Sequence, residues 1–244
     1  FLLACLLHDI GHAPFSHTCE NLFSYKEKIN NKNSKINKEL LAEIKSHLDD
    51  PAYHVFEKDY FSLIMKNPPA PHEIMSSIIT CRKFGDYNKF FESENINSLN
   101  LDLIVRSIIG CCYSYKRTDD EDKRLELGIK NCLIRLLNSS TVDVDKLDYI
   151  ARDTQMSGYD SIVLDNKRLL DNVCIVDNDG IYYPAFGKGA LSVLNNVVIA
   201  KNSQAKWIIN HPVVIYEAYL LCKAIGISLA NSGLRNTDNV VLSS

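Results

Sequence analysis

The sequence has little of what marks several large classes of protein. Its 27 lysines and arginines against 30 aspartates and glutamates leave a formal net charge of −3 over 244 residues. No general positive field therefore draws the chain to nucleic acid or to an anionic membrane, and an anionic substrate must be held by local positive groups. The eight cysteines are scattered and form no CxxC pair, which excludes the common zinc-finger spacings and a secreted disulfide framework. We expect free cysteines in a cytoplasmic protein.

Long apolar runs and strand patterns are also scarce. The first apolar run, residues 1–7, is too short to cross a bilayer and leads directly into His8-Asp9, so no membrane partner is expected. Alternation of apolar and polar residues is rare, and no internal repeat is visible. A content of 46% hydrophobic and 23% charged residues is ordinary for a globular protein with a sizeable core.

Apolar residues at three- and four-residue spacing instead predict a mostly helical chain. The expected helices are 1–7 (the end of a buried helix), 15–23, 39–48, 56–65, 72–81, 98–110, 125–137, 142–154, 187–210 and 212–232. Residues 173–183 alternate around Asn178-Asp179-Gly180 and predict a β-hairpin. Residues 25–38 are rich in Lys and Asn and predict an exposed loop or partly disordered insertion. Asp50-Pro51 is expected to end the helix before it.

A cluster of chemically active side chains follows the first apolar run. Three of the seven histidines, one aspartate and one glutamate fall within thirteen residues: His8, Asp9, His12, His17 and Glu20. A helix cap needs one or two such groups, so the cluster predicts a site. His8 and Asp9 are adjacent at a helix end, and their mixed nitrogen and oxygen donors suit Mn, Fe, Zn, Co or Ni better than Ca.

Two further patterns add candidate groups. His17 and Glu20 face the same way on a helix, and a carboxylate bonded to an imidazole fixes its tautomer for acid or base work near neutral pH. The run at 142–153 carries acids at 143, 145, 148 and 153, and Asp145, Asp148 and Tyr149 would share a helix face. Taken alone, that run also fits a solvated charged face.

Four segments together resemble a known family. They are HDIGHAPFSHTCE at 8–20, HE at 72–73, DVDKLDYIARD at 143–153 and NHP at 210–212. The chain resembles the HD-domain phosphohydrolases and, within them, the deoxynucleoside triphosphate triphosphohydrolases (dGTPase-like). It lacks the Gly-Tyr-Pro motif of the cyclic-dinucleotide phosphodiesterases and the acidic segment of the guanosine-tetraphosphate hydrolases. The resemblance covers most of residues 1–215 except the 25–69 insertion.

The resemblance implies a fold and a metal site. We expect a mostly α HD catalytic domain over residues 1–165, with an insertion at about 24–70. A β-hairpin and a C-terminal helical extension over 166–244 should pack on it. The family binds a divalent metal ion (Mn, Fe, Zn, Ni, Co or Mg) through an upstream His, the His-Asp pair and a later Asp. His8, Asp9 and Asp145 match the last three. The upstream His has no counterpart after Phe1, so we expect the N-terminal part of the domain to be missing.

The resemblance also implies roles beside the metal. His17 would be the in-line catalytic group and Glu20 its orienting partner. His12 and His72 would contact phosphate or protonate the leaving group, although His72 also fits a helix-start residue stacked on Pro71. For the substrate, the matched positions are Lys146 and Tyr149 on the phosphates, Asp153 on the sugar hydroxyl, Lys201 in place of a family arginine, and Asn210 on the nucleotide.

Other residues have expected structural places. Ile209 stands where the family more usually has tyrosine, and Arg152 is expected to form an ion pair within its own helix. The remaining expectations are core packing or surface exposure: Trp207, Tyr182 and Tyr183 in the core, and His47 and His54 on the surface.

The implied reaction is hydrolysis of a deoxynucleoside triphosphate (dNTP) to a deoxynucleoside and inorganic triphosphate. The resemblance also implies a homo-oligomer, with nucleic acid not expected as a substrate. Two alternatives stay open at this point. One is a phosphatase or phosphodiesterase acting on another nucleotide through the same metal. The other is a nucleotide-binding sensor on an HD scaffold, which would keep nucleotide binding without hydrolysis.

Overall fold

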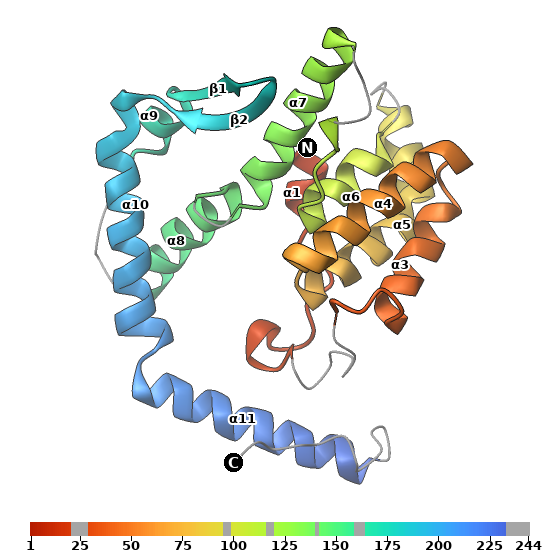
Figure 1. Ribbon diagram of the computed structural model, residues 1–244. Helices are drawn as coiled ribbons and strands as arrows, with labels where there is room; N and C mark the ends of the chain where they lie inside the picture. The colour runs from red at the N-terminus through yellow and green to blue at the C-terminus, as the bar shows by residue number, and fades with distance from the viewer. Residues whose placement is uncertain (21–28, 95–98, 116–119, 140–141, 159–163, 233–244) are drawn as a thin grey trace.

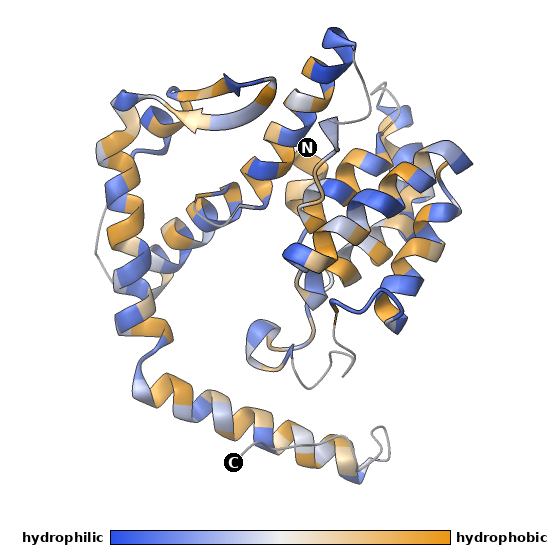
Figure 2. Cartoon of the chain, in the orientation of Figure 1, coloured by the Kyte–Doolittle hydropathy of each residue, from blue (hydrophilic) through white to orange (hydrophobic). Residues whose placement is uncertain are grey.

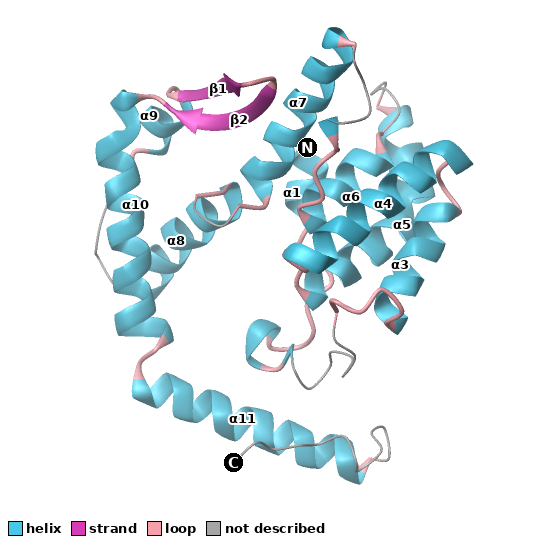
Figure 3. Ribbon diagram, in the orientation of Figure 1, coloured by secondary structure: helices cyan, strands magenta, loops and turns pink. Residues whose placement is uncertain are grey.

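A computed structural model describes residues 1–20, 29–94, 99–115, 120–139, 142–158 and 164–232. Within these ranges the chain is mostly helical with one two-stranded antiparallel sheet (Figures 1 and 3). The longer helices are α1 (Leu2–Leu7), α3 (Lys35–Lys45), α4 (Asp50–Lys66), α5 (Pro71–Ser93), α6 (Leu101–Ile109), α7 (Glu121–Leu137), α8 (Val144–Ser157), α9 (Asn166–Leu170), α10 (Leu191–Gln204) and α11 (Pro212–Asn231). Short helical turns are η1 (Ser16–Thr18), η3 (Lys188–Ala190) and η4 (Ala205–Ile209). The strands are β1 (Val173–Asn178) and β2 (Ile181–Phe186). The mostly α fold with a hairpin and a C-terminal helix is confirmed.

The main core lies among α1, α3, α4, α5 and α6, which pack together in Figure 1. It holds fully buried Phe56, Tyr60 and several isoleucines and leucines. Arg106 of α6 is buried with them and bonds Asp59 at 3.1 Å and Asp102 at 2.8 Å. A buried guanidinium needs such partners, because an unpaired charge in a core is strongly destabilising.

A second part of the molecule is built on α8, α9 and α10. Ile150 of α8 is buried against Val197 and Ala200 of α10. The hairpin packs on α7, where a Cβ added at Gly128 would lie only 2.3 Å from the ring of Tyr182. Asp179 and Gly180 turn the hairpin with φ angles of 54° and 76°, which is the geometry of a tight two-residue hairpin.

Helix α11 stands apart from both cores. Its 18-residue window has a mean hydropathy of 1.7 and is 6% buried, and Figure 2 shows apolar residues all along it. By length and composition alone, α11 could cross a membrane, which the sequence analysis did not foresee. One such helix is weak evidence for a span, and the expected cytoplasmic location stays a prediction.

Two predicted boundaries in the insertion are wrong. Residues 35–38 are helical rather than an exposed loop, because Ser34 caps α3 and Ile36 enters the core; residues 25–28 lie outside the described residues. Asp50-Pro51 starts α4 instead of ending α3. Pro51 lies in the first turn, where its missing N–H costs nothing.

Other differences concern exposure and helix type. Helix α5 runs twelve residues beyond Cys81, where its prediction ended. The described part of 15–23 is a 3₁₀ turn after Phe15, whose φ is 65°, and residues 21–23 lie outside the described part. Trp207 is 54% exposed and Tyr183 40% exposed, so neither is in the core. Residues 1–7 are only partly buried, since Leu2 and Leu6 face outward.

Several other expectations hold. All eight cysteines are free thiols, and His47 and His54 are exposed. Arg152 pairs with Asp148 one turn away on α8. The predicted domain boundary near residue 165 follows a stretch, 159–163, that lies outside the described residues, and it stays a prediction.

Candidate metal centre

The end of α1 positions His8 and Asp9. His8 is the C-cap residue of α1. Its ring nitrogen Nδ1 forms a hydrogen bond with the backbone carbonyl oxygen of Cys5, at 2.8 Å. As in many metal-binding histidines, a backbone bond at one ring nitrogen leaves the other free to act. The Ser76 hydroxyl of α5 donates to the His8 carbonyl oxygen at 2.5 Å, which fastens this turn to the core.

A glycine lets the site come close to α5. A Cβ at Gly11 would lie 2.3 Å from the Ser76 nitrogen and 2.5 Å from the His72 carbonyl oxygen. Both are backbone atoms that cannot swing away. Gly11 N–H donates to Ser76 Oγ at 2.8 Å. Glycine is therefore required here for the HDIGH segment to reach the helix that carries His72.

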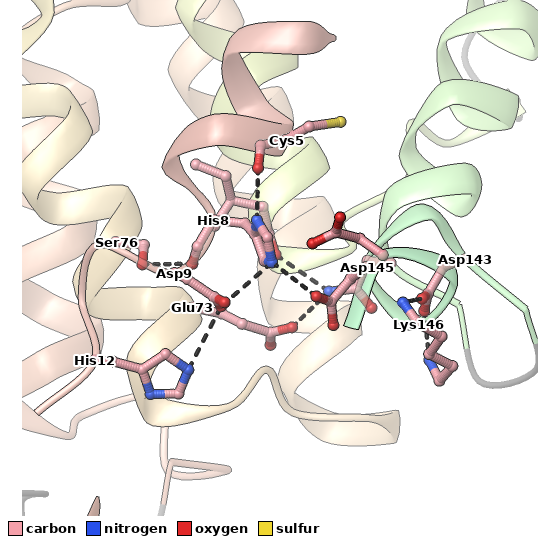
Figure 4. Close-up of polar contacts among 12 residues, drawn as sticks. Cys5, His8, Asp9, His12, Glu73, Ser76, Asp143, Asp145 and Lys146 are labelled. Atoms are coloured by element: carbon pink, nitrogen blue, oxygen red, sulfur yellow. Dashed lines mark hydrogen bonds and ion pairs between the residues drawn. The ribbon is translucent and has the colours of Figure 1, made fainter. Parts of the chain in front are cut away.

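The third group comes from the start of α8. Asp143 caps this helix by accepting from the Lys146 backbone N–H at 2.8 Å. Asp145 then falls in the first turn, facing the end of α1 (Figure 4). His8 Nε2 lies 3.3 Å from Asp145 Oδ1 and 3.3 Å from Asp9 Oδ1. His8 and Asp145, which are 137 positions apart, thus converge, as the resemblance implies.

This donor set fits a divalent cation. His8 Nε2 is buried and makes no hydrogen bond to the described residues, although two carboxylates face it. The Asp145 carboxylate beside this ring raises the pKa of His8 to about 9, although burial of the ring acts to lower it. The same contact with His8 lowers the pKa of Asp145. One nitrogen and two carboxylates within 4.8 Å of one another are suitable ligands for such an ion.

A second cluster adjoins the first: His12, His17, Glu20 and His72. Asp9 links the two clusters, since its Oδ1 lies 3.4 Å from His12 Nε2. The rings of His12 and His72 stack with centroids 4.0 Å apart, while His17 meets His12 edge-on at 4.6 Å. Burial and the neighbouring His72 lower the pKa of His12, which favours its neutral form.

Glu20 holds this cluster together. Its Oε1 accepts from the His72 backbone N–H at 3.2 Å and lies 2.9 Å from His72 Nδ1, and its Oε2 lies 3.5 Å from His17 Nδ1. Burial raises the pKa of Glu20, but the bonds with His72 and His17 outweigh burial and lower it overall. Glu20 thus contacts His72 more closely than His17, the partner expected from spacing.

Both clusters open into one cavity of about 540 Å³. The predicted site residues that line it are His8, Asp9, His12, His17, His72, Asp145, Lys146, Tyr149 and Asp153. Ile209 lines it as well. Glu20, Lys201 and Asn210 are not among the lining residues. Glu20 contacts the ring of His72, which does line the cavity. Lys201 lies half-buried on α10, and Asn210 is exposed after η4.

Lys146 has partners within the protein. Its Nζ donates to the Ser139 carbonyl oxygen at 2.6 Å and forms a close ion pair with Asp143. The Asp143 carboxylate is almost fully buried. A phosphate oxygen that approached this ammonium would share it with Asp143 or displace that carboxylate.

Several residues at the site had no predicted role, among them Glu73, Ser76, Asn138 and Asp143. Glu73 accepts from the Ala70 N–H at 2.6 Å and from the Asn138 side chain at 2.7 Å, and burial raises its pKa. It belongs to the HE pair, and it both caps α5 and lines the cavity. Asp143 could have been identified from the preference for Asp before a helix start; Ser76 and Asn138 have no comparable signal.

Fold and site together describe a helical domain in which a His-Asp candidate metal centre lies beside a histidine cluster. No family model matches the chain. It is 26% identical over 202 residues to an uncharacterized protein of Mycoplasma genitalium and 27% identical over 202 residues to its homologue in Mycoplasma pneumoniae. These matches cover 82% of this chain and 35% of each relative.

A third relative has a descriptive name. The chain is 29% identical over 185 residues to an Acanthamoeba polyphaga mimivirus protein described as HD domain-containing, covering 75% of this chain and 28% of that protein. The chain therefore spans about a third of the length of the curated relatives it matches. This match supports an HD domain. Separately, the donor groups of the site could hold a metal ion.

Proposed function

We propose that this chain carries the catalytic site of a phosphohydrolase that converts a dNTP to a deoxynucleoside and inorganic triphosphate. One observation supports this most: the His8-Asp9-Asp145 donors and the His12-His17-His72 cluster share a cavity and meet at Asp9. A phosphate bound in this cavity would lie beside the metal-binding donors, whose ion would neutralise its charge, and beside the histidines, which could transfer protons. The dNTP substrate itself is inferred from the motif resemblance.

Each group has a chemical task in this reaction. A divalent ion bound by His8, Asp9 and Asp145 would supply positive charge to the phosphate oxygens. Water attacks the α-phosphorus, the bond from that phosphorus to the 5′ oxygen breaks, and the 5′ oxygen takes a proton. His17, which is 70% exposed and lies beside the partly buried Glu20, is the group that we assign to in-line proton transfer.

The substrate contacts complete the proposal. His12 and His72 bind phosphate or protonate the leaving 5′ oxygen. Lys146 and Tyr149 bind phosphate from the first turns of α8, and Asp153 meets the sugar hydroxyl. Lys201 lies on α10, and Asn210 directly follows Ile209, which lines the cavity. They would reach the nucleotide as it fills the remaining volume.

The test is product analysis with the full-length protein. Incubation with Mn²⁺ and each dNTP, followed by ion-exchange chromatography, should yield inorganic triphosphate. Release of only monophosphate or diphosphate, or activity on other nucleotides in a panel, would favour the phosphatase or phosphodiesterase alternative. Binding without any release would favour the sensor.

A matched pair of variants ties the reaction to the site. Asp145→Ala removes a candidate ligand and should abolish triphosphate release. Asp148→Ala removes an exposed carboxylate on the same helix, paired only with Arg152 among the described residues, and should leave release unchanged. Equal rates in both variants would contradict the proposal.

We also propose that the protein is a cytoplasmic homo-oligomer that does not act on nucleic acid. The support is the net charge of −3 and the exposed apolar side chains of α11, including Ile215, Tyr216 and Ile227. Sedimentation of the purified full-length protein without detergent tests both the assembly and its solubility.

A further inference from the structure

Two cysteines distant in sequence meet beside the site. Cys19 and Cys222 are 203 positions apart, yet their sulfur atoms lie 3.4 Å apart. The Cys222 thiol also donates to the Thr18 carbonyl oxygen at 2.8 Å. These contacts connect α11 to the segment after η1, and Figure 1 shows that segment projecting toward α11.

We propose that Cys19 and Cys222 form a redox modification site, whose reversible disulfide ties α11 to the catalytic segment and slows hydrolysis. The oxidant class is a hydroperoxide. The proposal stands on the contact between the two sulfurs and on the place of Cys19 in the chain, directly before Glu20.

The geometry needs only a small adjustment. A disulfide has a sulfur–sulfur distance of about 2.05 Å, so the two sulfurs must approach by about 1.4 Å from the observed contact. Cys222 lies on a largely exposed helix, which can shift without opening a core. The resulting loop would span most of the chain, from the first catalytic segment to the last described helix.

The two thiols have different surroundings, which sets the order of the steps. Cys222 is partly exposed and meets the peroxide first, while Cys19 is fully buried. Burial raises the pKa of Cys19 to about 11, so it is inert toward an oxidant in solution. Peroxide oxidises the Cys222 thiol to a sulfenic acid and is itself reduced to water. The Cys19 sulfur then attacks that sulfur, and hydroxide leaves with the Cys19 proton as a second water.

The bond would act on the site through Glu20. Glu20 follows Cys19 and contacts both His72 and His17, so movement of Cys19 toward α11 displaces the partner of two catalytic histidines. A misplacement of about 1 Å can cost on the order of a hundredfold in rate. We therefore expect the disulfide to lower the rate of hydrolysis by about tenfold to a hundredfold. This effect on rate rests on the proposed function, whereas the formation of the bond does not.

Peptide mapping tests the bond directly. The full-length protein is reduced, treated with hydrogen peroxide, alkylated, digested without reductant and examined by mass spectrometry. A cross-linked peptide pair joining positions 19 and 222 should appear and revert with dithiothreitol. It should be absent in Cys222→Ser and present in Cys174→Ser, which removes an exposed cysteine on β1 as the matched control.

Rate measurements complete the test. Peroxide should lower triphosphate release in the native protein and in Cys174→Ser, with recovery on reduction, and should spare Cys222→Ser. Single oxidation at Cys222 without the cross-linked pair would overturn the proposal, and so would a cross-linked protein with an unchanged rate. If the reduced protein releases no triphosphate, the proposed function fails, and the peptide map alone decides whether the thiol pair forms.

Discussion

The two ring nitrogens of His8 have different surroundings, and this difference is central to the candidate metal centre. Nδ1 is engaged by the Cys5 carbonyl, while Nε2 is buried opposite two carboxylates. The ring is thus oriented before any ion binds, because its backbone bond selects the tautomer that leaves Nε2 unprotonated in the neutral form.

Metal binding should therefore stabilise the protein in a way that depends on His8. At a Mn²⁺ concentration about a hundred times Kd, the expected stabilisation is about 2.7 kcal/mol, or roughly 5–10 °C in Tm for a domain of this size. EDTA should reverse the shift, and His8→Ala should abolish it. The surface variant His54→Ala, whose side chain is 69% exposed, should keep it. A shift that survives His8→Ala would place the ion elsewhere.

Glu20 gives a pH-dependent contribution to stability. Its pKa is lowered in the folded protein, with burial opposed by the bonds to His72 and His17. The contribution is therefore present above the unfolded value, about 4.3, and is lost as pH falls through the lower folded value. Glu20→Gln should destabilise by about 1 kcal/mol at pH 7, and this difference should shrink in acid.

Urea unfolding at a series of pH values measures this effect. Glu126→Gln is the control, because that side chain is 62% exposed and pairs with Lys130 on the surface of α7. Its effect should stay below about 0.5 kcal/mol. If the loss of unfolding free energy caused by Glu20→Gln grew as the pH fell, the lowered pKa of Glu20 would not be the source of this stability.

At the scale of elements, the site depends on how closely the HDIGH turn approaches α5. Gly11 meets backbone atoms of Ser76 and His72 at distances that leave no room for a side chain. The turn carries the metal-side groups and α5 carries His72. Separation of these two elements would therefore disturb both clusters together.

Gly11→Ala should destabilise the protein by about 1–3 kcal/mol through overpacking and should strongly reduce hydrolysis. The control is Gly85→Ala on the same helix α5, where an added Cβ meets nothing within 4 Å. That change should be neutral or stabilising by up to about 1 kcal/mol, since alanine favours a helix interior. Thermal unfolding of both variants measures the difference. Similar stabilities would show that α5 can move away from the turn at Gly11 at little cost in free energy.

At the scale of the whole molecule, α11 is an apolar helix with little cover from the described chain. Its only buried residue is Gly226. Exposed apolar area of this kind favours association in water. We therefore expect α11 to contribute little to the free energy of unfolding of a single described chain, but to contribute strongly to self-association.

The double variant Ile215→Ser/Tyr216→Ser should leave the free energy of unfolding within about 0.5 kcal/mol at protein concentrations where the chain is monomeric. Sedimentation should show weaker self-association than in the native protein. Leu2→Ser, at a side chain 78% exposed on α1, is the control and should not change assembly. A loss of stability as large as that of a core substitution would mean that α11 packs within the monomer.

Much of the site could be predicted because its chemistry is local. The HDIGH segment places His8, Asp9 and His12 on one turn, and the Asp145 run is periodic along α8. Periodicity also located most helices and the hairpin. It misplaced the starts of α3 and α4, where the cap at Ser34 and the proline at position 51 outweighed composition.

The sequence by itself determined the kinds of donors, the helices that carry them and the turn residues that join them, since these follow from short-range spacing and backbone preference. Only the tertiary structure decided which donors meet. The contacts of His8 with Asp145, of Glu20 with His72 and of Cys19 with Cys222 join positions 137, 52 and 203 residues apart. Such pairings depend on how the helices pack, and no local pattern specifies that packing.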